Sequence, residues 1–201
     1  MTESGASIFA ASERGLATFA KGSPDAAAPL FAEANGTGTV RSAALGESHL
    51  YVASASRGLE TYSLADPLSP ALVDVVTTAG VQSDDGTSDV AVDGDLLLLA
   101  DGRLRLEVFD LTNPAKPSSL GVIAGGDSVN AIELSNGTAF VCVGNAAMMV
   151  IDYSGPSPTK LGEINLNASV SGCIGLKAVG DHLYVAGARA LDFDDLGAHI
   201  G

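Results

Sequence analysis

The residues of this sequence best suited to hold a metal ion are four carboxylates and one amide. They fall in two corresponding loops of a repeat, and they are Asp84, Asp85, Asp89, Asp127 and Asn130. Hard cations such as Ca²⁺ take several oxygen ligands, so this set is compatible with a Ca²⁺ or other cationic site. The spacing matches no EF-hand loop, however, and the sequence favours a solvated acidic turn over metal binding.

Four of the six arginines recur at one kind of place, the turn that follows an apolar run. They are Arg14, Arg57, Arg103 and Arg189. Guanidinium groups bind carboxylate or phosphate oxygens bidentately, so an arc of arginines could bind an anionic ligand. Alternatively each arginine pairs with an acidic side chain of its own or the adjacent unit, as Glu13 and Asp101 would permit, and the sequence favours this structural role.

The two cysteines, Cys142 and Cys173, occupy neighbouring repeats. Cys142 ends an apolar run, and Cys173 precedes the first strand of the next unit, so both are expected toward the same end of adjoining units. A disulfide fits this placement and would suit an exported protein, but two buried, inert thiols fit it as well.

Other chemistry is not indicated. The sequence contains no recognisable motif of nucleophilic catalysis or phosphate binding. A formal net charge of −14 opposes binding to nucleic acid or anionic membranes, which are bound mainly through Lys and Arg. The longest apolar stretch is far shorter than the roughly 18 residues of a membrane-spanning helix, and we expect no secretory signal in the chain as given.

The elements that must position these residues form an internal repeat. All eight prolines fall in four close pairs, whose leading members are 43, 47 and 42 residues apart. The pairs are Pro24 and Pro29, Pro67 and Pro70, Pro114 and Pro117, and Pro156 and Pro158. A period of this size, carried by short alternating segments, is typical of a β-propeller, in which each unit buries its faces against its neighbours.

Each complete unit contains four segments with the composition of strands, named A to D from the innermost to the outermost. Strand A is expected at 90–94, 132–137 and 176–180, and strand B at 8–11, 50–53, 96–100, 139–143 and 183–186. Strand C is expected at 16–20, 59–63, 106–110, 148–152 and 190–194, and strand D at 30–33, 71–76, 120–124 and 161–164. The predicted fold is therefore all-β, a β-propeller of four-stranded antiparallel blades.

The proline pair lies between strands C and D of each unit. Proline lacks the N–H that a central strand must donate, so it is confined to turns, strand starts and edges. Asp110 and Asp152 lie four residues before their prolines, where a short carboxylate can accept backbone N–H groups of the turn.

The repeats resemble those of a known family. Residues 106–117 and 148–156, and the segment His-Leu-Tyr-Val-Ala at 49–53 and 182–186, look like the LVIVD repeat. This resemblance implies a bacterial or archaeal β-propeller that is exported or anchored at the cell surface. It implies no shared enzymatic chemistry.

The terminal units are expected to be incomplete. The alignment of Gly5–Phe9 with Gly180–Tyr184 suggests that strand A is missing from the first unit, and strand D from the last. We expect one array over 1–201, about 4.5 blades, with units near 1–36, 37–80, 81–126, 127–168 and 169–201. It is expected to be part of a larger ring, and the alternative is a five-unit ring with irregular closure. The incomplete terminal sheets could associate edge to edge.

Two functions follow from these patterns. The favoured one is a non-enzymatic scaffold for protein or glycan ligands at the cell surface, without a cofactor, because the repeats account for nearly every marked residue. The alternative is a metal-dependent, Ca-type propeller hydrolase with an axial site built from the acidic loops.

Overall fold

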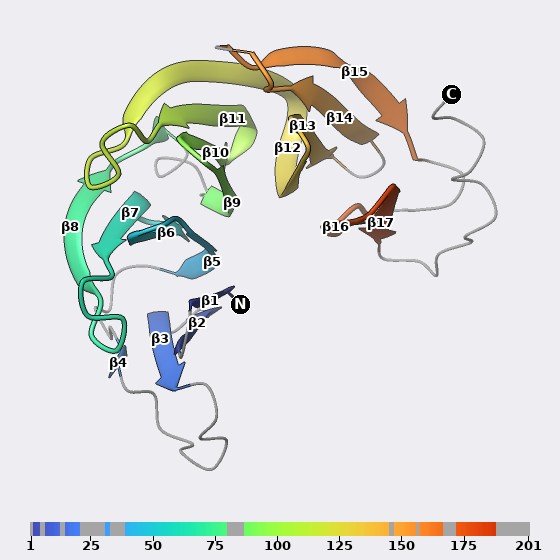
Figure 1. Ribbon diagram of the computed structural model, residues 1–201. Coiled ribbons are helices and arrows are strands. Elements are labelled where there is room, and N and C mark those ends of the chain that lie inside the picture. The colour runs from blue at the N-terminus through green and yellow to red at the C-terminus, as the bar shows by residue number, and fades with distance from the viewer. Residues whose placement is uncertain are drawn as a thin grey trace. The chain divides into compact units, whose positions relative to one another are not determined.

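The computed structural model describes residues 2–4, 7–12, 15–20, 31–32, 39–79, 87–144, 147–155, 157–166 and 172–187. Every element in these residues is a β-strand, which confirms the predicted all-β class. The chain forms two compact units, residues 1–129 and 130–201, and each is described by itself. The strands are labelled in Figure 1.

The first unit contains two antiparallel sheets of four strands and the first four strands of a seven-stranded antiparallel sheet, β9–β15, which β12 carries into the second unit; the strands follow sequential order in each. The first sheet comprises β1 (Thr2–Ser4), β2 (Ser7–Ser12), β3 (Gly15–Ala20) and β4 (Phe31–Ala32). The second comprises β5 (Val40–Leu45), β6 (His49–Ser54), β7 (Gly58–Ser63) and β8 (Ala71–Val76). The third comprises β9 (Thr87–Asp93), β10 (Leu96–Asp101), β11 (Arg103–Asp110) and the first part of β12 (Ser118–Ser135).

The second unit continues the same order. The remainder of β12 is followed by β13 (Thr138–Val143), β14 (Ala147–Asp152) and β15 (Thr159–Asn165), and then by the hairpin of β16 (Gly175–Val179) and β17 (His182–Ala186). These strands confirm the predicted four-stranded antiparallel units. The expected strand at 190–194 lies outside the described residues.

The prediction that the first unit lacks strand A is wrong. β1 pairs antiparallel with β2, with Thr2 opposite Phe9 and Ser4 opposite Ser7, and completes a four-stranded sheet. The sequence of β1 is Thr-Glu-Ser, which has no apolar residue and therefore no alternation that marks a strand.

Two segments expected to be loops are strands instead. β12 runs without a break from Ser118 to Ser135, through Gly125 and Gly126, where the sequence predicts the loop that contains Asp127 and Asn130. Residues 87–89, expected in the acidic loop, begin β9, where Thr87 pairs with Asp101 and Asp89 with Ala100. At the start of β9, pairing with β10 overrides the local preference of aspartate for turns.

The core of the first unit lies on both faces of the β5–β8 sheet. On one face Phe9 and Leu16 pack with Leu50 and Tyr62. The other face packs against the β9–β12 sheet through residues that include Tyr51, Leu59, Leu97 and Phe109. Because both faces are buried, the second strand of each sheet reads as a continuous apolar run.

The turns from β11 to β12 and from β14 to β15 begin with the aspartate contacts that the sequence predicts. Asp110 Oδ1 accepts the N–H of Thr112 at 2.9 Å, and Asp152 Oδ1 accepts the N–H of Ser154 at 2.8 Å. The Ser154 hydroxyl also donates to Asp152 Oδ1 at 2.6 Å, and this bond, together with the N–H bond of Ser154, lowers the pKa of Asp152 below its usual value. The carboxylates therefore satisfy backbone donors in the proline-containing turns, which explains why aspartate precedes the prolines.

Tyr51 ties one sheet of the first unit to the next. Its fully buried phenol donates to the carbonyl of Pro114 at 2.9 Å. Burial, helped by the charge of Asp95, raises the pKa of Tyr51 to about 12. The neutral phenol is thus favoured in the folded state, and its contribution to stability is lost as the pH rises from about 10 through about 12.

An alkaline titration followed by absorbance near 295 nm, recorded by rapid mixing before unfolding, should therefore include the ionisation of Tyr51 near pH 12, and Tyr51→Phe should reduce the amplitude of this late component. Tyr184→Phe should retain it. An unchanged late ionisation in Tyr51→Phe would contradict the assignment.

Candidate functional site

The candidate site lies at one end of the sheets of the first unit, here called the loop face. It comprises the turns from β6 to β7 and from β10 to β11, together with residues 77–79 after β8. Two groups of charged side chains occupy it, one in each sheet.

Arg57 closes its own hairpin. Its Nη1 lies 3.2 Å from Glu60 Oε1, and the hydroxyl of Tyr62 donates to Glu60 Oε2 at 2.7 Å. Glu60 is only 3% exposed, so its charge is compensated inside the sheet. This geometry is the structural pairing that the sequence favoured for the arginines, with Glu60 as the partner.

The other three predicted anion ligands cannot be placed with Arg57. Arg14 and Arg189 lie outside the described residues. The backbone of Arg103 begins β11, but its side chain is not among those described.

A second group, Asp101, Arg105 and Glu107, is here called the ionic triad. Arg105 Nε lies 3.5 Å from Asp101 Oδ2, and Arg105 Nη2 donates to Glu107 Oε1 at 2.8 Å. Thr78, which follows β8, donates its hydroxyl to Asp101 Oδ1. The Asp101 side chain is fully buried, whereas the side chain of Arg105 is 36% exposed and connects the triad to solvent.

Burial raises the pKa of Glu107 above its usual value. The hydrogen bond from Arg105 lowers this pKa, and the neighbouring charge of Asp101 raises it. A carboxyl with a raised pKa can act as an acid or base, but ion-pair networks perturb pKa values in the same way. The arrangement is thus an ion-pair network in which Arg105 connects two carboxyl groups.

The β12–β15 sheet shows that a unit folds without the triad. Leu96 pairs with Asp110 in one sheet and Thr138 with Asp152 in the other, so strand positions can be matched from these pairs. The matching positions to the triad are Val143, Ala147 and Met149. Arg105 and Glu107 are charged where the next unit has apolar residues. A position-by-position comparison of strands B and C between units would therefore have found them, whereas the pattern of arginines in the turns did not.

The predicted metal ligands belong to both units, and some of them lie outside the described residues. Asp84 and Asp85 lie outside it, as does the side chain of Asp127. Asp89, in the first unit, accepts the N–H of Val90 with its Oδ1 at 2.9 Å. Within the described part of the chain no three His, Cys, Asp or Glu residues are grouped as metal ligands, and the Ca²⁺ site stays a prediction.

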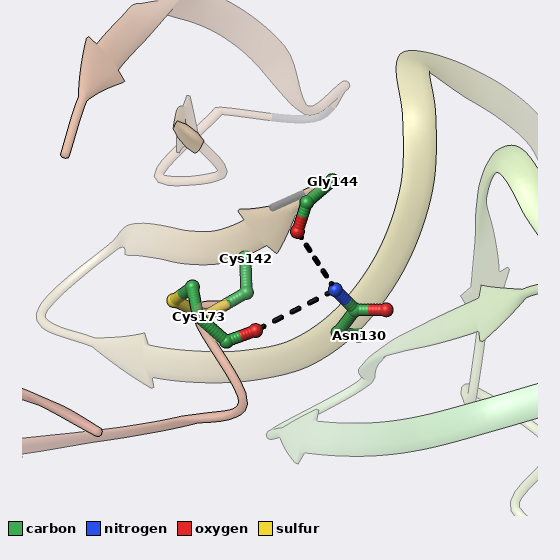
Figure 2. The surroundings of a disulfide bond; sticks show 4 residues. All are labelled: Asn130, Cys142, Gly144 and Cys173. Carbon is green, nitrogen blue, oxygen red and sulfur yellow. Dashed lines mark hydrogen bonds between the residues drawn. A yellow bond between two sulfur atoms is a disulfide. The ribbon is translucent and has the colours of Figure 1, made fainter. Parts of the chain in front are cut away.

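Asn130, the fifth predicted ligand, holds backbone in the second unit. Its Nδ2 donates to the carbonyl of Gly144 at 3.0 Å and to that of Cys173 at 3.5 Å, as Figure 2 shows. The side-chain amide is therefore used to join β12 to the end of β13 and to the segment before β16.

Cys142 and Cys173 form a disulfide beside Asn130 (Figure 2). Their Cα atoms are 5.5 Å apart, and both residues are fully buried. The bond joins β13 to the segment that precedes β16, where the N–H of Ile174 donates to the carbonyl of Ala186. The β16–β17 hairpin is thereby attached covalently to the sheet before it.

Two segments of the sequence, residues 86–123 and 125–164, match the family model of the LVIVD repeat. The chain contains LVIVD repeats. The first repeat covers β9 to β11 and the first part of β12, and the second covers the remainder of β12 through β15, so one LVIVD repeat corresponds to one four-stranded sheet. The resemblance noted in the sequence is confirmed.

Solved structures similar to the LVIVD-repeat chain are β-propellers. A computationally designed protein, Ika8, is 9% identical with a TM-score of 0.65, covering 92% of this chain and 53% of its own. BamB from Moraxella catarrhalis is 12% identical with a TM-score of 0.65, covering 90% and 52%. The N-terminal domain of Nup159 is 10% identical with a TM-score of 0.54, covering 87% and 47%.

These likenesses confirm the predicted β-propeller fold and, at such low identity, the fold alone. The LVIVD-repeat chain spans about half the length of the three proteins. A search of curated protein sequences finds no match to it. In the described residues, no helix has the length and apolar character needed to span a membrane.

Proposed function

We propose that this LVIVD-repeat chain is a non-enzymatic β-propeller scaffold that presents its loops to a protein or glycan ligand at the cell surface. The observation that carries this proposal is a constant frame with connections of variable length. The outermost strand is linked to the innermost strand of the next sheet by residues 33–39, by 77–86, by 166–174, or by no loop at all within β12. Recognition sites are commonly built from variable loops on a rigid frame.

The charges of the loop face support this proposal. Arg57, Asp101, Arg105 and Glu107 are engaged with one another or with their own strands, as a framework role requires. The buried disulfide is compatible with an oxidising compartment outside the cytosol. The family resemblance supports the same location.

A loop exchange in the purified protein tests the scaffold function. Residues 80–86 would be replaced by a Gly/Ser segment of equal length, and binding of the labelled protein to cells of the source organism would be measured. We expect binding to be lost while the melting curve is unchanged. Protease treatment of the cells should abolish binding if the ligand is a protein, and periodate treatment if it is a glycan.

A matched variant in the turn from β5 to β6, at the opposite end of the strands, serves as the control. Glu47→Ser should bind as the wild type does. Unchanged binding by the loop-exchange variant would contradict the proposal, as would recovery of the native protein only from the cytosolic fraction. A Tm raised by several degrees in millimolar CaCl₂ relative to EDTA would instead support the Ca-type hydrolase.

A further inference from the structure

The outer strand β8 forms an apolar edge of its sheet. It is the last strand in the order β5-β6-β7-β8 and pairs with β7 (Figure 1). Three of its six residues are exposed aliphatic side chains, Leu72 at 39%, Val73 at 47% and Val75 at 36%. Leu68, in the preceding turn, is 45% exposed. An edge strand presents unpaired backbone groups that can pair with another chain.

The other outer strands share the position of a bulge but differ in how they are protected. In the pairings of β8, β12 and β15, one register shift falls next to an exposed aliphatic residue, which is Val73 in β8, Leu120 in β12 and Leu161 in β15. The residue after it is glycine in β12 and β15, and β15 also carries Lys160 and Glu163. Lysine, bulges and short length are the usual protections of a sheet edge. β8 keeps the bulge but has neither lysine nor glycine.

The charge around β8 is of one sign. Residues 58–79 contain no lysine or arginine, and Asp66 and Asp74 lie on either side of Leu72 and Val73. Two copies of this edge would place like charges together in a chain that already carries a net charge of −14, which opposes self-association. A complementary segment must be extended, aliphatic and basic.

We propose that β8 binds an extended segment of a partner protein, with alternating aliphatic and Lys or Arg residues, as an added β-strand. Backbone hydrogen bonds to the outer edge of β8, the last strand of its sheet in the described residues, would supply affinity, and contacts with Leu72, Val73 and Val75 would supply specificity. Asp66 and Asp74 favour basic residues in the partner. This inference rests on the proposed scaffold function, since it assigns one surface and one class of protein partner to it.

A peptide of seven residues that alternates lysine and valine, blocked at both ends and labelled, is a direct probe. Fluorescence anisotropy with the full chain should show saturable binding, and amide hydrogen exchange should slow at residues 71–76 when peptide is bound. Val75→Lys should weaken binding about tenfold, because it places a like charge against the peptide on the exposed edge. Val122→Lys, at the matching position of β12, should change affinity less than about twofold.

A second peptide with the same side chains and alternate N-methylated amides separates strand pairing from simple charge attraction. It should bind at least about tenfold more weakly, because half of its donors are removed. Three results would each overturn the inference. They are equal binding of both peptides, equal effects of Val75→Lys and Val122→Lys, and no binding at a peptide concentration of about 1 mM. The loop-exchange assay reads the scaffold function on another surface, so either proposal can fail without the other.

Discussion

Reduction of the Cys142–Cys173 disulfide should lower the free energy of unfolding of the second unit by about 3.5 kcal/mol. The bond closes a loop between cysteines separated by 31 residues, and a cross-link of this span restricts the unfolded chain substantially. It also attaches the β16–β17 hairpin, a two-stranded element that is marginally stable by itself.

Urea unfolding of protein refolded with and without reductant measures this change, and hydrogen exchange locates it. We expect protection to fall in β13 to β17, while the amides of β5 to β11 keep theirs. The Cys142→Ala, Cys173→Ala double variant is the control, because reductant should not affect it. An equal loss of protection in β5 to β11, or no shift of the urea midpoint, would show that the bond does not stabilise the second unit specifically.

Asp101→Ala should lower the free energy of unfolding by about 3 kcal/mol. It leaves the buried Thr78 hydroxyl without its acceptor and removes one of the two carboxylates that Arg105 contacts. Removing one partner of a buried ion pair is costly because the other charge stays behind, although the partial exposure of Arg105 limits this cost.

Replacing the whole ionic triad should have little effect or increase stability. The triple variant Asp101→Val, Arg105→Ala, Glu107→Met carries the residues that the β12–β15 sheet has at matching positions. Buried ion pairs exchanged for packed apolar groups are often neutral or stabilising. A triple variant as unstable as Asp101→Ala would contradict the view that the triad can be dispensed with for folding.

The pH dependence of stability provides a second measurement on the same variants. Because the pKa of Glu107 is raised in the folded state, the protonated carboxyl is favoured there. The protonated carboxyl therefore adds to the free energy of unfolding below the unfolded-state pKa near 4.5, and this stabilisation is lost as the pH rises through the folded-state pKa. This loss should be absent from the triple variant.

The repeat could be predicted because its signals are local. Short apolar runs mark strands such as β6 and β10 wherever they pair, and proline is confined to turns such as that around Pro114 because it has no N–H to donate. The same reasoning found the role of Asp110, whose carboxylate bonds to a residue two positions away. Strand β1 was missed because it has no apolar residue and depends on pairing with β2.

The charged side chains of the candidate site could be predicted only in part. The preference for structural pairing holds for Arg57, but its partner Glu60 and the role of Arg105 were not foreseen. A turn motif lists the arginines that share a position in sequence. It does not say which side chains share a face of a sheet, since that depends on strand register.

By itself, the sequence determined the four-stranded repeat, its period and its proline turns, because each follows from backbone preferences within a few neighbouring residues. Only the tertiary structure decided that Arg105 joins Asp101 and Glu107, that β12 continues through its glycines, and that Cys142 meets Cys173. These outcomes depend on pairing between distant segments and on burial that removes water from charged and sulfur-containing groups. Such pairing has no local signature, because the energy of each contact is set by the partner that the fold brings to it.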